Sequence, residues 1–395
     1  MKIVFVQDSL GAGGSERSNA ELWYFLRDQG VELKILILEH RKAGVEQEIL
    51  EAGFDVSFIK ATKFLGQSKK LARLIKKTNP DLVHSTLFKS NMRVRFAKLI
   101  VKFYHIESLV STPYSKHRLL DPKLNAKKIK IVKHFNALTQ KFGVNHFHAN
   151  GQTVAAHYRE KLNVPEHKLS IIHRGRKPNP FATKKNHPEI KALRAELNPE
   201  NKLQLINVGR MEGQKAQIII LRALLDLKEN GVGDFVFLIA GREGKQTEEL
   251  YSFVEKNELD EHIKFLVHRS DIYKLLVSSD GFIFPSRSEG LPGALIEAEA
   301  AGLPIICSDI DSNLEVVKKD KNGLVFPVDN VQQLVEHLQK LIADQNLREQ
   351  MGAQSLKIFE ERFQLDAIHE QMLEFYKSML SEKTVWCSRV YCKIV

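Results

Sequence analysis

The stretch from Asp280 to Pro304 constrains the fold of this chain more than any other. It opens with Gly281–Phe284, a short apolar run typical of a strand that is buried on both faces. A polar loop follows, and then the alanine-rich segment Gly293–Ala301, which has the composition of a helix packed closely on a sheet. The boundaries are marked by Pro285, Pro292, Gly302 and Pro304. The stretch predicts a helix N-terminus at the carboxyl edge of a parallel sheet, where α/β proteins bind anionic ligands.

Two carboxylates stand eight positions apart in this stretch, Glu289 in the loop and Glu297 in the helix. Taken alone, they could be a solvated loop charge and an exposed helix residue. Together with the neighbouring loop they resemble the E-x7-E signature of retaining GT-B glycosyltransferases, family 4 in particular. The resemblance implies that Glu297 holds the ribose of a nucleotide-sugar and that Glu289 lies near the donor sugar. It also implies that loop residues meet the sugar and the phosphates, here Gly290, Leu291 and Pro292.

A second motif lies after the apolar strand Leu203–Val208. Gly209-Arg210, followed by Lys215, resembles the GR-x4-K motif of the same family, whose Arg and Lys hold the donor diphosphate. The chemistry calls for such a pair, because negative charge gathers on the β-phosphate when the bond to the sugar breaks. The resemblance therefore implies that Arg210, Lys215 and Glu289 are the catalytic residues. Ala216 stands where the family usually has glycine, and two exposed cations after a strand are the alternative interpretation.

Further donor-binding residues are implied by the same resemblance. Gly241 ends the strand Phe235–Ala240 as in the family, and His268 and Arg269 lie in a loop that resembles the one reading the nucleotide base. Near the N-terminus, Gly13 and Gly14 resemble the glycine loop that faces the donor phosphate and the acceptor. Their spacing is G-x-G-G, so the dinucleotide fingerprint G-x-G-x-x-G is absent. A tight turn that needs glycine is the alternative.

The acceptor side departs from the commonest family pattern. Asp81–Ser85 resembles a strand that ends in a histidine at the cleft, here His84, although a core histidine would leave the same pattern. Many members of the family carry another histidine after the following strand, and this chain has Thr112 and Tyr114 there instead. We expect one of these two side chains to occupy that space.

The length and the resemblance together predict two domains. The chain has 395 residues, and the resemblance extends over nearly all of it. It implies the α/β GT-B fold, with two facing, doubly wound Rossmann-like domains and a cleft between them. We predict an N-terminal acceptor domain at residues 1–180 and a donor domain at 181–361, with a helix at 362–395 crossing back to the first domain. Phe181–Asn201 is expected to be a linker, and Leu169–Arg176 resembles the interdomain segment with Arg174 and Arg176 in place of Asn and Val.

Positive charge is concentrated in one part of the chain. Residues 51–180 contain 26 Lys and Arg against 7 Asp and Glu, whereas residues 181–395 contain 27 against 33. Such asymmetry suggests nucleic acid, an anionic membrane or an anionic substrate. Two lysine-rich amphipathic stretches, Phe64–Lys77 and His117–Lys141, favour the membrane, so we expect the first domain to dock on an anionic surface.

The sequence therefore predicts a hexosyl- or N-acetylhexosaminyl-transferase. The donor is a nucleoside-diphosphate sugar, with UDP preferred, and the acceptor is a hydroxyl of a glycan or lipid-linked glycan in surface polysaccharide biosynthesis. Retention of configuration and independence of metals and cofactors come from the resemblance alone. No signal peptide or apolar run long enough to span a membrane is seen, so we expect a cytoplasmic enzyme, peripheral at the inner face of the membrane. The alternatives are a GT-B-like epimerase or phosphorylase and a basic nucleic-acid-binding protein.

Overall fold

The computed structural model describes the whole chain except residues 42, 62, 117–124, 268 and 392–395. It divides into two compact units, and the chain passes between them at Arg174/Gly175 and at Leu365/Asp366. These crossing points lie several residues from the predicted boundaries at 180/181 and 361/362. The first unit contains residues 1–114, most of the segment up to Arg174, and the chain from Asp366 onward. The second contains Gly175–Leu365, and Ser115 and Lys116 group with it.

The first unit is built on a seven-stranded parallel sheet with the order β3-β2-β1-β4-β5-β6-β7. The strands are β1 Lys2–Gln7, β2 Glu32–Ile37, β3 Val56–Phe58, β4 Leu82–Thr86, β5 His105–Leu109, β6 His146–Ala149 and β7 Leu169–Ile171. The helices are α1 Gly14–Asp28, α2 Glu46–Glu51, α3 Phe64–Thr78, α4 Phe88–Ala97, α6 Ala126–Gly143, α7 Gln152–Leu162 and α16 Leu365–Tyr391.

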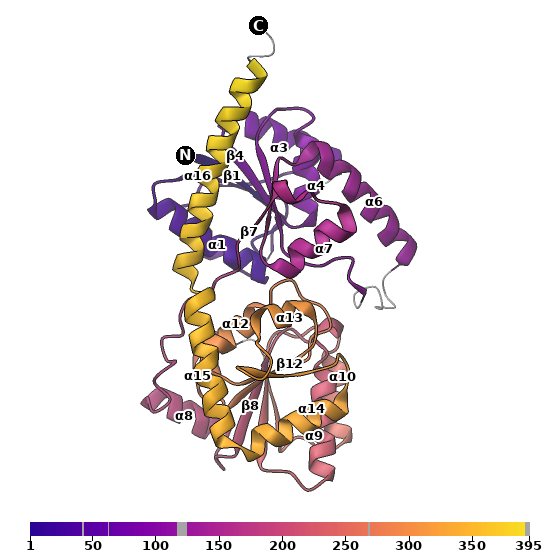
Figure 1. Cartoon of the computed structure of the whole chain (residues 1–395), viewed down its shortest axis with the longest axis vertical. Coiled ribbons are helices and arrows are strands. Elements are labelled where there is room, and N and C mark those ends of the chain that lie inside the picture. Colours follow the sequence, from indigo (N-terminus) through magenta and orange to yellow (C-terminus); the bar gives the residue numbers. More distant parts are fainter. Residues whose placement is uncertain (42, 62, 117–124, 268, 392–395) are drawn as a thin grey trace. The chain divides into compact units, whose positions relative to one another are not determined.

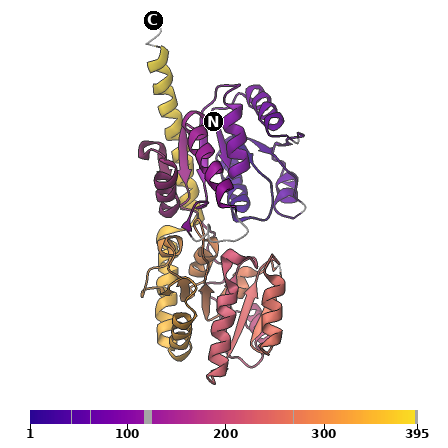
Figure 2. The same ribbon diagram turned by 90° about the vertical axis from the view of Figure 1, so that its right-hand side faces the viewer.

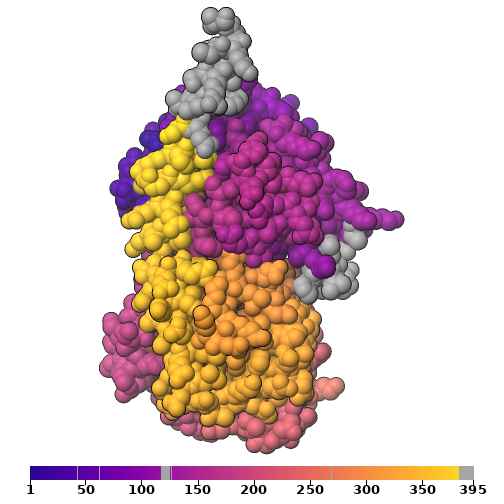
Figure 3. All heavy atoms as spheres, in the orientation of Figure 1, coloured from indigo at the N-terminus to yellow at the C-terminus, as the bar shows by residue number. Residues whose placement is uncertain are grey.

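Helices cover both faces of this sheet, as Figure 1 shows. One apolar cluster joins α1, α2 and α16 to one face, and a second joins α3 and α4 to the other. The last helix is thus part of the first unit, and the residues of α16 that are drawn in yellow lie directly against that unit in Figure 3. The strands read as continuous apolar runs because they are buried on both faces.

The second unit has a six-stranded parallel sheet with the order β10-β9-β8-β11-β12-β13. The strands are β8 Leu203–Val208, β9 Phe235–Ala240, β10 Ile263–Leu266, β11 Gly281–Phe284, β12 Ile305–Ser308 and β13 Gly323–Phe326. The helices are α8 Pro188–Leu197, α9 Gln217–Glu229, α10 Thr247–Lys256, α11 Ile272–Val277, α12 Gly293–Ala300, α13 Asp311–Val316, α14 Val331–Ala343 and α15 Gln345–Arg362. A short 3-10 turn lies at Gly213–Lys215, and the first unit has another at Glu166–Lys168.

The core of the second unit also has two sides. Helices α9, α10 and α14 pack on one face of the sheet, and α8, α11, α12 and α15 pack on the other. Figure 2, turned by 90° from Figure 1, shows strands of this sheet with helices beside them. Both units are therefore Rossmann-like and doubly wound, which confirms the predicted fold class at the level of each domain. The expected linker at Phe181–Asn201 is wrong, because it contains α8, whose Ile190, Leu193 and Leu197 are buried in this core.

Candidate functional site

The candidate site of the second unit lies where the strand order reverses. In its sheet β8 is flanked by β9, which follows it in the chain, and by β11, which belongs to the other half of the fold. The loops that leave β8 and β11 must diverge at this point, and open α/β sheets bind ligands in the crevice thus formed. Both predicted motifs are here, since Gly209-Arg210 follows β8 and the loop with Glu289 follows β11.

An ion pair joins the two loops. The Nζ atom of Lys215 lies 2.6 Å from Oε1 of Glu289, and the side chains are 19% and 13% exposed. The same ammonium group lies 5.2 Å from the ring centre of Phe284, the last residue of β11. The structure therefore brings together two of the three residues predicted to be catalytic, in a place where water screens their charges only in part.

Arg287 connects the two loops by hydrogen bonds, and sequence reasoning did not single it out. Its backbone N–H donates to the carbonyl of Gln214 at 2.8 Å and its Nη1 donates to the carbonyl of Gly213 at 2.9 Å. Its Nε also donates to Asp329 at 2.8 Å. Arg287 thus ties the loop after β11 to the turn that carries Lys215. A basic residue beside Glu289 was the only signal in the sequence.

The two glycines predicted at the strand ends pack against each other. A Cβ atom on Gly241 would lie 2.1 Å from the carbonyl oxygen of Gly209, and Gly241 has a φ of +158°. Gln217 donates to the carbonyls of Gly209 and Arg210, both at 3.2 Å. The guanidinium of Arg210 is exposed and bonds to no residue that the structure describes, so it is open to an anion.

Glu297 lies on α12, and its partner is Arg176. The Nε atom of Arg176 donates to Oε1 of Glu297 at 2.7 Å, and the side chains are 8% and 24% exposed. The sequence showed Arg176 only as a departure from the family's apolar residue in the interdomain segment. Its role as the counter-ion of Glu297 was missed because 121 positions separate the two residues.

The other predicted donor residues divide into several groups. Leu291 belongs to the apolar core, so its side chain is not available to a ligand, while Pro292 caps α12 and Gly290 is half-buried. Arg269 is held by Asp271 through two hydrogen bonds of 2.8 and 2.6 Å. His268 lies outside the described residues.

In the first unit, Gly13 and Gly14 lie at the N-terminus of α1, after the carboxyl end of β1. A Cβ atom on Gly13 would lie 2.3 Å from the carboxylate of Glu16, so this carboxylate packs closely against the loop at Gly13. Asp8, at the end of β1, accepts hydrogen bonds of 2.7 and 2.6 Å from the backbone N–H and hydroxyl of Ser90. Burial raises the pKa of both Asp8 and Glu16. The sequence analysis had singled out neither carboxylate.

The acceptor-side predictions need correction. His84 is 1% exposed and lies in the middle of β4 rather than at its end, so it is a core histidine. Tyr114 packs in an apolar cluster, and its hydroxyl accepts a hydrogen bond of 3.0 Å from Asn136. Thr112 is buried as well. These side chains are packed inside the first unit and do not present free polar groups to a ligand.

His84 is part of a chain of hydrogen bonds whose direction follows from its ends. Nε2 of His148 must donate to the carbonyl of Ile172, 3.1 Å away, because a carbonyl only accepts. Its Nδ1 then accepts from the hydroxyl of Ser108 at 2.9 Å, and that oxygen accepts from Nε2 of His84 at 2.7 Å. Finally, Nδ1 of His84 accepts from the hydroxyl of Tyr376 at 2.6 Å. Neutral rings agree with the burial that lowers the pKa of both histidines, and the bond from Tyr376 joins α16 to the core of the first unit.

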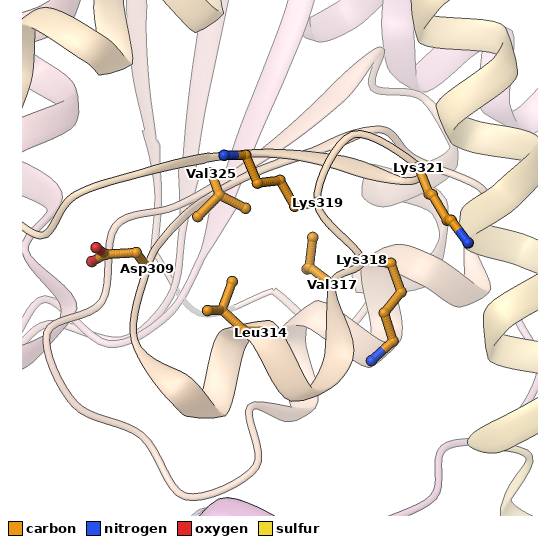
Figure 4. A pocket seen from close by; sticks show the side chains of 7 residues that line it. All are labelled: Asp309, Leu314, Val317, Lys318, Lys319, Lys321 and Val325. Carbon is orange, nitrogen blue, oxygen red and sulfur yellow. The ribbon is translucent and has the colours of Figure 1, made fainter.

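A hollow of about 520 Å³ lies elsewhere on the second unit, beside the edge strand β13. Figure 4 shows the apolar side chains of its floor, while the charged ends of its lysines are spread around the rim and do not converge on one point. It is lined by Asp309, Leu314, Val317, Lys318, Lys319, Lys321 and Val325. None of the predicted site residues belongs to it.

Both halves of the chain match families of known proteins. Residues 12–179 match the family described as Glycosyltransferase Family 4, and residues 189–357 match Glycosyl transferases group 1. An *Escherichia coli* protein named UDP-Gal:alpha-D-GlcNAc-diphosphoundecaprenol alpha-1,3-galactosyltransferase is 27% identical over 300 residues, which cover 74% of this chain and 73% of that protein.

A *Campylobacter jejuni* protein named N,N'-diacetylbacillosaminyl-diphospho-undecaprenol alpha-1,3-N-acetylgalactosaminyltransferase is 25% identical over 334 residues, or 82% of this chain and 80% of that protein. Among solved structures, *Anabaena* HepE in complex with UDP and glucose superimposes with a TM-score of 0.82 at 20% identity, covering 96% of this chain and all of that one. In the part of the chain that the structure describes, no helix has the length and apolar character needed to cross a bilayer.

Proposed function

Because this chain belongs to the family 4 glycosyltransferases of the GT-B fold, we propose that it transfers a hexose or N-acetylhexosamine from a UDP-sugar to a hydroxyl of a lipid-linked glycan, with retention of configuration. The observation that carries the proposal is the pairing of Lys215 with Glu289 at the switch point of the second sheet. Arg210, which follows β8, and Glu297, on α12, supply the other charged groups of the two motifs.

The charges suggest how the reaction is assisted. The diphosphate of the donor binds to Arg210 and Lys215, and these two cations stabilise the charge that develops on the leaving phosphate. Lys215 is already ordered by Glu289, so little reorganisation is needed when the phosphate arrives. Glu289 is then in reach of sugar hydroxyls, and Glu297 accepts hydrogen bonds from the ribose. We propose that these groups act without a metal ion or another cofactor.

The relatives support the donor and the acceptor class. The *E. coli* relative carries UDP-Gal in its name, and the names of both bacterial relatives specify diphosphoundecaprenol-linked acceptors. We therefore propose UDP as the nucleotide, a lipid-linked glycan of surface polysaccharide biosynthesis as the acceptor, and the cytoplasmic face of the membrane as the place of action.

The surface of the first unit supports contact with an anionic membrane. Helices α3, α4 and α6 contain five, three and five Lys or Arg residues and no Asp or Glu. Of the ten large apolar side chains that are exposed among the described residues, eight lie on these helices or directly after α4. They are Leu65, Phe88, Leu99, Ile100, Ile131, Phe135, Leu138 and Phe142. Residues 117–124 of the predicted stretch His117–Lys141 lie outside the described residues.

Helix α6 shows the pattern most clearly. Ile131, Phe135, Leu138 and Phe142 follow the spacing of one helix face and are 44–71% exposed. Lys127 and Lys128 lie one turn before this apolar stripe and are exposed as well. An amphipathic helix of this kind lies in the membrane interface, where each lysine contributes about 1 kcal/mol of attraction to anionic lipid. We propose that α6 docks the acceptor-binding unit on the leaflet that holds the lipid-linked acceptor.

The donor is tested by thermal shift with UDP-, GDP- and ADP-sugars, because a ligand at 100 times its Kd raises the free energy of unfolding by about 2.7 kcal/mol. We expect a UDP-sugar to give the largest shift, and transfer to a diphosphoundecaprenol-linked glycan to give an α-linked product from an α-linked donor. If no nucleotide-sugar raises the melting temperature, the transferase proposal is wrong for this site. Donor turnover to an epimer or a sugar phosphate would favour the epimerase or phosphorylase instead.

Docking is tested by co-sedimentation with phosphatidylglycerol and phosphatidylcholine vesicles at low and high salt. We expect binding to the anionic vesicles only, and we expect salt to weaken it. Substitution by Glu at Lys69, Lys70, Lys127 and Lys128, or by Gln at Ile131 and Leu138, should also weaken this binding. Leu50→Gln is the matched control, because Leu50 is an exposed apolar residue on α2, away from the three basic helices. Equal binding to both lipids would reject the docking proposal, and salt-sensitive binding to DNA alone would favour the nucleic-acid alternative.

A further inference from the structure

Arg176 lies at the point where the two segments that join the units meet. It is the second residue after the crossing at Arg174/Gly175, and the other crossing is at Leu365/Asp366. Its backbone N–H donates to the carbonyl of Phe363 at 2.9 Å, and its carbonyl accepts from the N–H of Leu365, also at 2.9 Å. Arg176 and Gln364 thereby form an isolated parallel bridge, so the two crossing segments are bonded to each other inside the second unit.

The side chain of the same residue reaches the donor site. Nε of Arg176 donates to Oε1 of Glu297, and Nη1 donates to the carbonyl of Gly175 at 3.0 Å. A Cβ atom added to Gly293 would lie 2.1 Å from Nη2 of Arg176. The guanidinium is therefore packed against the first residue of α12, in a space that exists because residue 293 is glycine.

This position of Arg176 demands a counter-ion. A helix N-terminus carries a partial positive charge, and a buried guanidinium beside it is unfavourable unless an anion neutralises it. Glu297, one turn further along α12, supplies that anion with one of its two oxygens. Its second oxygen, Oε2, accepts no hydrogen bond from any residue that the structure describes. The pair thus fixes the carboxylate and leaves one oxygen for a ligand.

We propose that Arg176 is a positioning residue for Glu297: it holds Oε1 so that Oε2 faces the ribose hydroxyls of the donor, and it ties this carboxylate to the segments that join the two units. The inference rests on the proposed function, because it takes the ribose as the ligand of Glu297. It goes further in assigning a residue that neither motif contains, and in giving Gly293 the role of making room for the guanidinium.

The experiment measures the Kd of UDP, GDP and ADP, and of their 2′,3′-dideoxy counterparts, by calorimetry. Removal of the hydroxyls isolates the interaction of the ribose with Glu297 from that of the diphosphate. We expect the wild type to bind its preferred ribonucleotide about ten times more tightly than the dideoxy form, because the loss of a hydrogen bond to a carboxylate weakens binding by about that factor. Arg176→Gln should reduce this preference to less than about threefold by weakening the ribonucleotide alone.

Two further variants keep the test decisive. Gly293→Ala displaces the guanidinium without removing it, and because the group it meets is the end of a flexible side chain, the fold is expected to persist. Gly293→Ala should reduce the preference for the ribonucleotide over the dideoxy form in the same way as Arg176→Gln. Glu297→Gln should abolish this preference, and the double variant with Arg176→Gln should then behave like Glu297→Gln alone. Arg222→Gln, at an exposed arginine of α9, is the control and should leave all Kd values unchanged.

The outcomes distinguish a failure of the positioning role of Arg176 from a failure of the ribose role of Glu297. If Glu297→Gln removes the preference for the ribonucleotide but Arg176→Gln and Gly293→Ala retain it, the ribose assignment stands and the positioning role is overturned. Equal losses of the ribonucleotide and the dideoxy form in Arg176→Gln also overturn it, because the effect is then not on the ribose. If the wild type does not distinguish the two forms, the proposed role of Glu297 fails, and the inference about Arg176 fails with it.

Discussion

The buried histidines of the first unit predict that this unit is unstable in acid. Burial lowers the pKa of His105 to about 3 and the pKa values of His146, His148 and His157 to about 4. It also lowers the pKa of His84 well below its usual value. In the unfolded chain these groups titrate near pH 6.5. Below about pH 6.5 the unfolded state therefore binds protons that the native state does not, and the native state loses stability as the pH falls toward the folded pKa values.

The size of the effect follows from the number of groups. One proton bound only by the unfolded state changes the free energy of unfolding by about 1.4 kcal/mol per pH unit. Five such histidines give about 6–7 kcal/mol per pH unit between roughly pH 6 and pH 5. A domain has a stability of about 5–15 kcal/mol, so the first unit should unfold within one to three pH units below 6.5. Asp8 and Glu16, whose pKa values are raised by burial, act in the opposite sense and reduce the slope near the acid end.

The assay is urea unfolding between pH 7.5 and pH 5, followed by the fluorescence of Trp23, which is buried in the core of the first unit, in a Trp386→Phe background. His148→Gln should lower the slope of the unfolding free energy by about one fifth, or about 1.4 kcal/mol per pH unit. The control is His134→Gln, because His134 is exposed on α6. A slope below about 1 kcal/mol per pH unit, or one that His148→Gln leaves unchanged, would refute the reasoning.

Three further predictions concern the second unit. Arg210→Ala and Lys215→Ala should each reduce kcat by about 10²–10³ while the melting temperature is retained, as the loss of a group that stabilises the leaving phosphate does; near-normal turnover would contradict their role. Gly241→Ala should lower the free energy of unfolding in urea by more than about 1 kcal/mol, because its Cβ would meet the carbonyl of Gly209, whereas Gly233→Ala, which meets only ordinary contacts, should be neutral. Activity measured with excess EDTA should equal that measured with Mg²⁺, and a loss restored by Mg²⁺ would reject the proposal that no metal takes part.

The parts of the fold that the sequence predicts are those encoded locally. Strand β11, its loop and α12 were found because an apolar run, a proline and an alanine-rich segment follow one another without interruption. The linker prediction failed although the local signal was there: Pro188 at the start of α8, with Ile190, Leu193 and Leu197 on one face, has the spacing of a buried helix. The polar residues between them, together with the prolines, are equally typical of a linker.

Buried polar residues mark the limit of prediction from one sequence. His84 and Tyr114 fit the pattern of residues at the end of a strand, where a ligand would be found, but a strand buried on both faces gives the same pattern. What decides between the two is the partner, and the partners of His84 are Ser108 and Tyr376, the latter 292 positions away. A side chain whose hydrogen bonds are completed by such distant residues cannot be recognised from its neighbours in the chain.

Arg176 shows why the same limit hides part of the candidate site. A glycine at position 293 looks like an ordinary helix-starting residue, and an arginine at position 176 looks like a surface charge beside a linker. In the structure each explains the other, because the guanidinium occupies the space beside Gly293 and Glu297 neutralises it. An apolar residue at 176 would fill the same space without a charge, and Glu297 would then lose its counter-ion. Arg176, Gly293 and Glu297 therefore depend on one another. A change at any one of them alters the position or the pairing of the carboxylate that we assign to the ribose.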